Sequence, residues 1–191
     1  ARVSAEVFAG NGIKVFLFSK PVPTPMVSHT VVRKGAAGGV VLTASHNPPE
    51  FHGFKFKEPE GASSSLETTR GIEKHLGRTR LRYLPFEKAL KQRRIVCLDG
   101  DRSYVATLRK QVSRRLFQKA HLKVLVDPLH GSTSEILPRA LSLGKTWIEL
   151  LHPERDVLFG GRAPEPIPEC LTALSERMRR GRYDIGIALD G

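Results

Sequence analysis

A serine in a short polar turn is the residue of this chain best suited to chemistry. Ser45 lies in the run TASHNPP, residues 43–49, directly after the apolar segment 40–43. A hydroxyl at the end of a strand can face backbone N–H groups and helix N-termini, and both of these bind anions. The position therefore suits a serine that carries a phosphoryl group, although an ordinary turn serine before Asn-Pro-Pro is the simpler alternative.

The surroundings of Ser45 do not favour a hydrolase nucleophile. The Gly-x-Ser-x-Gly pattern of the α/β-hydrolases is missing from the sequence around it. The neighbouring base, His46, is the next residue, and adjacent side chains in an extended segment point apart. A general base must come within roughly 2.6–3.2 Å of the hydroxyl that it activates. The sequence thus favours phosphoryl transfer over acyl transfer.

Two further residues carry chemistry in combination with that serine. Lys55 follows Gly53, and a lysine beside a phosphate and a divalent cation can act as a general acid and base. Asp190 ends the apolar segment 183–189, and a carboxylate in such a place can hold Mg²⁺ against a phosphate. Taken singly, a surface lysine on an edge strand and an aspartate that starts a turn are the simpler interpretations.

Other polar clusters predict structure more than chemistry. The run DGDR at residues 99–102 precedes an amphipathic helix, so Asp101 is expected to be an N-cap or first-turn acid and no metal ligand. His130 follows a strand and enters a helix within the run HGST, where capping is a simpler role than anion binding. Cys97 and Cys170 have no partner at the spacing of a zinc site.

The composition predicts an affinity for anions. Thirty-one Lys and Arg residues stand against 19 Asp and Glu, which gives a formal net charge of +12. Nucleic acid, a membrane surface and a phosphosugar all qualify as partners, but the basic residues are scattered in small clusters, which weakens a nucleic-acid role. No apolar run is long enough to span a bilayer and no secretory leader is apparent. Because two cysteines cannot make a disulfide scaffold, we expect a cytoplasmic protein. The scattered charge and the missing apolar span lead us to expect neither nucleic acid nor a membrane as partner. A basic nucleic-acid-binding module remains the alternative of another class.

The first half of the chain predicts a strand–helix–strand unit that positions the serine. A strand is expected at residues 14–18, and a helix with Thr24 as its N-cap is expected to end near Gly35. The next strand, 40–43, is almost wholly apolar, so we expect both of its faces to be buried. This order predicts a parallel pair of strands with a crossover helix, and it places Ser45 at a carboxyl end, where ligands gather.

The second half predicts a new α/β unit after a boundary near residue 100. Apolar residues at helical spacing predict a helical face over residues 105–116 and another over 171–178. Strands are expected at three segments: 123–126, 147–150 and 183–189.

Five motifs in this order resemble the α-D-phosphohexomutases, the phosphoglucomutase and phosphomannomutase group. They are PTP at 23–25, TASHNPP at 43–49, GFK at 53–55, VLVDPLHGS at 124–132 and DIGIALDG at 184–191. The resemblance implies an α/β fold of two small three-layer domains with mixed sheets, both incomplete. Residues 1–100 would be domain I without its N-terminal part, and residues 101–191 would be domain II, ending where the magnesium loop begins.

The resemblance also implies roles for single residues. Ser45 would be the catalytic phosphoserine, His46 and Asn47 would shape its loop, and Lys55 would be the general acid and base. Asp190 would be the first aspartate of the DGDxDR loop that binds Mg²⁺, with the Ser45 phosphate as a further ligand. One departure is His52, where the family usually has asparagine.

The implied reaction interconverts hexose 1-phosphate and hexose 6-phosphate through a hexose 1,6-bisphosphate. A phosphoglucomutase/phosphomannomutase is expected first, and a phosphoglucosamine mutase is the alternative. Because the family's later domains recognise the sugar and grip its phosphate, the 191-residue chain by itself is expected to be inactive.

Overall fold

The computed structural model describes residues 1–48 and 50–191. Within these ranges three side chains are not described, those of Asp101, Arg114 and Phe117. Pro49, the second proline of the predicted serine turn, therefore lies outside the described residues. The same holds for the Asp101 side chain, which the sequence predicts to cap a helix.

The chain divides into two units, which we describe one at a time. Unit 1 comprises Ala1–Leu42 and Lys55–Gly100, and unit 2 comprises Thr43–Phe54 and Asp101–Gly191. The segment that contains Ser45 is thus grouped with the second half of the chain. The domains 1–100 and 101–191 expected from the sequence stay a prediction.

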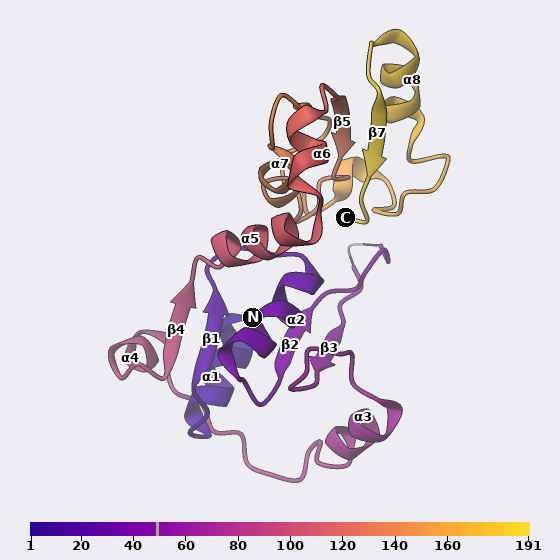
Figure 1. The fold of residues 1–191 in the computed structure, drawn as a ribbon. Coiled ribbons are helices and arrows are strands. Elements are labelled where there is room, and N and C mark those ends of the chain that lie inside the picture. Colours follow the sequence, from indigo (N-terminus) through magenta and orange to yellow (C-terminus); the bar gives the residue numbers. More distant parts are fainter. Residues whose placement is uncertain (49) are drawn as a thin grey trace. The chain divides into compact units, whose positions relative to one another are not determined.

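Unit 1 contains short helices and two pairs of strands (Figure 1). Its elements are α1 (Arg2–Gly10), β1 (Val15–Phe18), α2 (Thr24–Lys34), β2 (Gly39–Leu42), β3 (Phe54–Lys57), α3 (Leu66–Glu73), α4 (Phe86–Lys91) and β4 (Ile95–Leu98).

The pairing of the strands in unit 1 corrects the sequence prediction. Strand β1 pairs in parallel with β4, with Val15 opposite Ile95, and β2 pairs with β3. The predicted parallel pair of β1 and β2 is therefore wrong, although the strands at 14–18 and 40–43 both exist. Consecutive strands are neighbours in only about two thirds of cases. The apolar run Ile95–Leu98 is a strand that the sequence analysis did not identify.

Helix α2 begins and ends close to the predicted residues. Its N-cap is Pro23 and its first residue is Thr24, so the prediction of Thr24 as the N-cap is wrong by one position. Gly35 ends the helix in the left-handed conformation, at φ 56°, as a C-terminal glycine commonly does. The next strand, β2, is only partly buried, with Val41 as its one buried residue, so burial on both faces is not observed.

The core of unit 1 lies where two helices meet the β1–β4 pair. Its fully buried members are Ala5, Ala9, Ala89 and Ile95. Alanines on α1 and α4 leave room for close approach of the two helices, and Leu84 and Phe86 fill the space beside them. Helix α1 also holds the chain that enters α4, because the Glu6 carboxylate accepts the Phe86 N–H at 2.9 Å.

Unit 2 is built on a three-stranded parallel sheet. Its elements are α5 (Asp101–Gln111), α6 (Arg114–Lys119), β5 (Lys123–Asp127), α7 (Ile136–Leu141), β6 (Trp147–Leu150), the short 3₁₀ helix η1 (Phe159–Gly161), α8 (Thr172–Arg180) and β7 (Ile185–Ala188). The strand order is β6–β5–β7, and both outer strands run parallel to β5. All three strands predicted for this half are confirmed.

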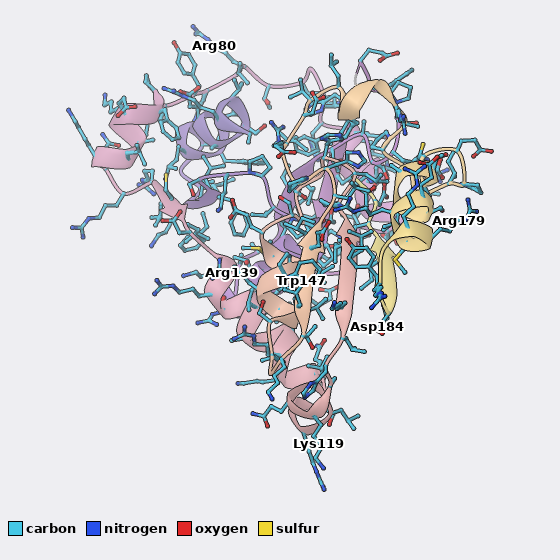
Figure 2. All side chains as sticks on the ribbon, turned by 90° about the horizontal axis from the view of Figure 1, so that it is seen from above. Arg80, Lys119, Arg139, Trp147, Arg179 and Asp184 are labelled. Carbon is cyan, nitrogen blue, oxygen red and sulfur yellow. The ribbon has the colours of Figure 1, made fainter. Side chains whose placement is uncertain are left out.

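Strand β5 is the buried centre of the sheet. Val124, Leu125, Val126 and Asp127 are each at most 3% exposed. Two contacts join the strands at the amino edge: Asp184, just before β7, accepts the Lys123 N–H of β5 at 2.7 Å, and the ring of Trp147 in β6 stacks on that of Tyr183 with centroids 6.3 Å apart. Figure 2 labels Trp147 and Asp184 at this edge, and it shows Lys119, Arg139 and Arg179 reaching outward from different elements of the unit.

The predicted helical face over residues 105–116 is interrupted. Helix α5 ends at Gln111 and α6 starts at Arg114. Val105 is buried, but Val112 and Leu116 are 36% and 68% exposed. The apolar spacing therefore describes α5 and does not continue into α6. Among all the helices of residues 1–48 and 50–191, none is both long and apolar enough to cross a membrane.

We predict that truncation of Ile95 destabilises unit 1. Ile95 is 1% exposed in the core, so Ile95→Ala should cost roughly 2–5 kcal/mol through lost burial and the cavity that remains. Hydrogen exchange in peptides from β1 and β4 measures this locally. Ile13→Ala is the matched control, because Ile13 is 51% exposed and its truncation should cost less than about 0.5 kcal/mol. Equal protection in both variants would contradict the assignment of this core.

Candidate active site

Ser45 adopts an unusual backbone conformation. Its φ is 58°, in the left-handed region that non-glycine residues avoid at a cost of roughly 1–2 kcal/mol. The Thr43 hydroxyl accepts the Ser45 N–H at 3.0 Å and so supports the turn. The serine is half-buried, whereas His46 and Asn47 are exposed. Backbone strain of this kind is found preferentially at functional sites, where it fixes a side chain in one direction.

The two ends of the serine loop are joined at Thr43 and Gly53. The Thr43 N–H donates to the Gly53 carbonyl at 3.0 Å. A Cβ added to Gly53 would lie 2.4 Å from the Thr43 carbonyl oxygen, so only glycine allows the two backbones to come this close. Inside the loop, the Asn47 N–H donates to the Ala44 carbonyl at 3.2 Å. The loop is therefore held both at its neck and around the serine.

The predicted site residues do not all fall in one unit. Ser45, His46 and Asn47 are grouped with unit 2, as is Asp190, whereas Lys55 belongs to unit 1. Lys55 is exposed on β3, and its near neighbour Lys57 is buried and donates to the Ser63 hydroxyl at 3.0 Å. Of the two lysines on this strand, Lys55 is therefore the one whose ammonium is accessible.

Asp190 is exposed just after β7, at the carboxyl edge of the parallel sheet. The residues beside it are fixed, because the Leu189 N–H donates to the Asp127 carbonyl at 3.0 Å and the Gly191 N–H donates to the Pro164 carbonyl at 2.9 Å. A carboxylate oxygen is the kind of ligand that Mg²⁺ prefers. Within the described part of the chain, no three His, Cys, Asp or Glu side chains are grouped to hold a metal ion, so Asp190 can supply one ligand and no complete cage.

A polar cluster around the buried Asp127 was missed by the sequence analysis. The Asp127 carboxylate is 0% exposed and accepts the Leu129 N–H at 2.9 Å. Both of its oxygens also lie 3.1 Å from His152 Nδ1. His130 Nδ1 lies 2.9 Å from the Glu154 carbonyl, and the two imidazole rings are 5.0 Å apart. The run VDPLHG contains Asp127 and His130, but the sequence offers no sign that His152 joins them.

A second carboxylate fixes the loop after β6. Asp156 accepts the N–H groups of Leu158 and Gly160, each at 2.9 Å. These two backbone hydrogen bonds lower the pKa of Asp156. Gly160 in turn lies against His130, since a Cβ added to it would be 2.9 Å from His130 Nε2. These loops line an open pocket of about 270 Å³ whose polar lining includes His130, His152 and Arg162.

We predict that a methyl group at position 53 opens the neck of the serine loop. In Gly53→Ala the new Cβ must push away the Thr43 carbonyl, at a cost of roughly 1–3 kcal/mol. Exchange of the Thr43 amide hydrogen, which bonds across the neck, should accelerate by tenfold or more. Gly71→Ala in α3 is the matched control, because nothing lies within 4 Å of its added Cβ and exchange at Thr43 should not change. Unchanged exchange in Gly53→Ala would show that the neck is not closed as described.

Two family models match the chain. The model described as phosphoglucomutase/phosphomannomutase, alpha/beta/alpha domain I, matches residues 1–82, and the one described as alpha/beta/alpha domain II of the same group matches residues 102–191. The α/β class expected from the sequence is confirmed by these matches and by the similar solved structure.

The chain is similar to longer proteins of this group. It is 34% identical to a protein of Methanothermobacter thermautotrophicus named "Probable phosphoglucosamine mutase", over 89% of the chain and 36% of that protein. It is 31% identical to a phosphoglucomutase/phosphomannomutase of Thermococcus kodakarensis, over 88% of the chain and 36% of that protein. A crystal structure from Thermus thermophilus, described as a phosphomannomutase, superimposes with a TM-score of 0.88 at 30% identity, over 100% of the chain and 43% of that structure.

The chain thus spans little more than a third of the length of the first of these relatives. Both family models fall on the halves that contain the serine loop and Asp190, and together they cover most of the sequence. With the strained serine turn in the first match and the parallel sheet in the second, the chain belongs to the α-D-phosphohexomutase family, the phosphoglucomutase and phosphomannomutase group.

Proposed function

We propose that the protein that carries this chain is a phosphohexomutase that moves a phosphoryl group between O1 and O6 of a hexose. The observation that carries this proposal is the left-handed turn at Ser45, supported by the Thr43 hydroxyl inside a loop closed at Gly53. Such a loop fixes the backbone that carries one hydroxyl, which suits a residue that repeatedly gains and loses a phosphoryl group. Family membership supports the assignment of this reaction to Ser45.

In the proposed reaction the phosphorylated Ser45 donates to the free hydroxyl of a hexose monophosphate. The bond between phosphorus and the serine oxygen breaks, and a bond between phosphorus and the sugar oxygen forms. Lys55 accepts the proton of the attacking sugar hydroxyl and returns a proton to the departing serine oxygen, which becomes the acceptor of the next transfer. The hexose 1,6-bisphosphate then turns round and returns its other phosphoryl group to Ser45.

Phosphoryl transfer depends mainly on positioning and on stabilisation of charge. The chain contributes to positioning through the fixed backbone at Ser45, which limits where the phosphoryl carrier can lie. It contributes one carboxylate, Asp190, which together with an oxygen of the phosphoserine is proposed to bind Mg²⁺. Bound Mg²⁺ would neutralise part of the charge on the transferring group.

Cytoplasmic location is likewise a proposal, supported by the free thiols of Cys97 and Cys170.

Two kinds of relative point to two kinds of sugar. Glucose and mannose phosphates are the first candidates, in line with the family description and the Thermococcus relative. Glucosamine phosphate is the second candidate, favoured by a relative named phosphoglucosamine mutase in Nitrobacter winogradskyi, which is 34% identical over 96% of the chain.

We predict that Ser45→Ala abolishes the mutase activity of the whole protein. The variant has no hydroxyl to carry the phosphoryl group, so conversion of hexose 1-phosphate should fall to background. Mass spectrometry of the wild-type protein should find one phosphate on the peptide that contains Ser45. Thr43→Ser keeps the hydroxyl that supports the turn and is the control. Full turnover by Ser45→Ala would overturn the proposed function.

We predict that Lys55→Gln lowers kcat by about 10²–10⁴-fold, the usual contribution of a general acid and base. Phosphorylation of Ser45 should persist, because the carrier itself is intact. Lys74→Gln, at another exposed lysine of unit 1, should leave kcat unchanged. Equal rates in Lys55→Gln and the wild type would remove Lys55 from the reaction.

The same assay separates the candidate sugars. Glucose 1-phosphate, mannose 1-phosphate and glucosamine 1-phosphate are compared by kcat/KM with the wild-type protein. A higher value for either hexose phosphate supports the first candidate, and a higher value for glucosamine 1-phosphate supports the second. Turnover of none of the three would contradict both.

A further inference from the structure

We infer that Asp127 and His152 are positioning residues that determine where the Asp190 carboxylate lies. The inference rests on the proposed function, in which Asp190 binds Mg²⁺. It concerns two side chains that reach Asp190 only through the backbone of a neighbouring turn.

Asp127 is fully buried at the end of β5. Its carboxylate is 0% exposed, and a buried carboxylate must be paired because the loss of its hydration is costly. It has two partners, the Leu129 N–H at 2.9 Å and His152 Nδ1 at 3.1 Å. Because a carboxylate oxygen accepts this hydrogen bond, we assign the donating N–H to His152 Nδ1. The turn after β5 and the loop after β6 are thereby tied to one buried group.

The Asp127 carboxylate supports a strained backbone turn. Leu129 has φ 46° and His130 has φ 60°, two consecutive non-glycine residues in the left-handed region. Such a pair is unfavourable by itself and persists only where the surroundings hold it. The bond from the Leu129 N–H to Asp127 holds one end of this turn. The bond between His130 Nδ1 and the Glu154 carbonyl holds the other.

The strained turn contacts the backbone of Gly191, next to Asp190. A Cβ added to Gly131 would lie 2.6 Å from Gly191 Cα, and one added to Gly191 would lie 3.0 Å from the Leu129 carbonyl oxygen. The turn therefore meets Gly191 backbone to backbone. On the other side of Asp190, the Leu189 N–H donates to the Asp127 carbonyl. The side chain of Asp127 thus acts on Asp190 through the turn that meets Gly191, while its backbone carbonyl holds Leu189 on the other side.

Removal of the His152 side chain would disturb the Asp127 carboxylate. Asp127 would lose its imidazole donor and keep the Leu129 N–H, and a buried carboxylate left short of donors draws in water or moves. Either response shifts the turn that contacts Gly191. Groups that hydrogen-bond a metal ligand directly commonly change metal affinity by about 10–100-fold when they are replaced, and because Asp127 and His152 act through the turn, we expect the lower end of this range.

The test measures the binding of Mn²⁺ as a probe for Mg²⁺ by electron paramagnetic resonance, in the whole protein that carries this chain. We expect Asp127→Asn and His152→Phe to weaken Mn²⁺ binding by about tenfold. His152→Asn should restore binding to within about threefold of the wild type, because its amide N–H can replace the Nδ1 donor.

Asp184→Asn is the matched control. Asp184 also accepts a backbone N–H, that of Lys123 at 2.7 Å, but at the amino edge of the same sheet. Its replacement should leave Mn²⁺ affinity unchanged even where the melting temperature falls. A lower melting temperature with unchanged Mn²⁺ affinity in Asp127→Asn and His152→Phe would make both residues merely structural and overturn the inference.

The outcome is separable from that of the proposed function. A wild-type protein that binds Mn²⁺ and loses it in Asp127→Asn supports the inference even if no hexose phosphate is converted. A wild-type protein that converts hexose phosphates but binds Mn²⁺ equally in all variants refutes the inference and leaves the mutase assignment in place.

Discussion

Burial of β5 between β6 and β7 is the constraint on which unit 2 depends. A parallel strand flanked on both sides and covered on both faces must be apolar, and Val124, Leu125 and Val126 meet that demand. Because the three strands are parallel, their carboxyl ends share one edge. The segments that follow the three strands therefore lie at that edge, and Asp190 belongs to the last of them.

The same constraint explains why a carboxylate can lie at the end of the buried strand. Asp127 is the last residue of β5, where burial continues but the apolar neighbours give way to loops. Its charge is compensated by a backbone N–H of one loop and an imidazole of the next. A polar group of this kind is costly to bury and, once satisfied, fixes the loops around it more narrowly than an apolar residue would.

Left-handed backbone occurs in the serine loop and in the turn after β5, as well as at Arg93, His152 and Phe159. Ser45 is left-handed and supported by the Thr43 hydroxyl, and the turn at Leu129 and His130 is left-handed and supported by Asp127. In both places a side chain two residues earlier accepts the N–H of the strained residue. Glycines at positions 53 and 131 then let the strained segment touch another backbone. The two loops thus use the same kind of hydrogen bond, one to fix the backbone that carries a hydroxyl and the other to fix the surroundings of a carboxylate.

Local spacing, turn chemistry and residue type were enough to predict the α/β class, the three strands of unit 2, the end of α2 at Gly35 and the motif around Ser45. They were not enough to pair β1 with β4, since a four-residue strand gains its partner from contacts about eighty residues away. For the same reason they gave no sign of His152 beside Asp127. These features came from the folded chain, because the free energy of a buried pair or a strained turn is supplied by groups that are brought together only on folding.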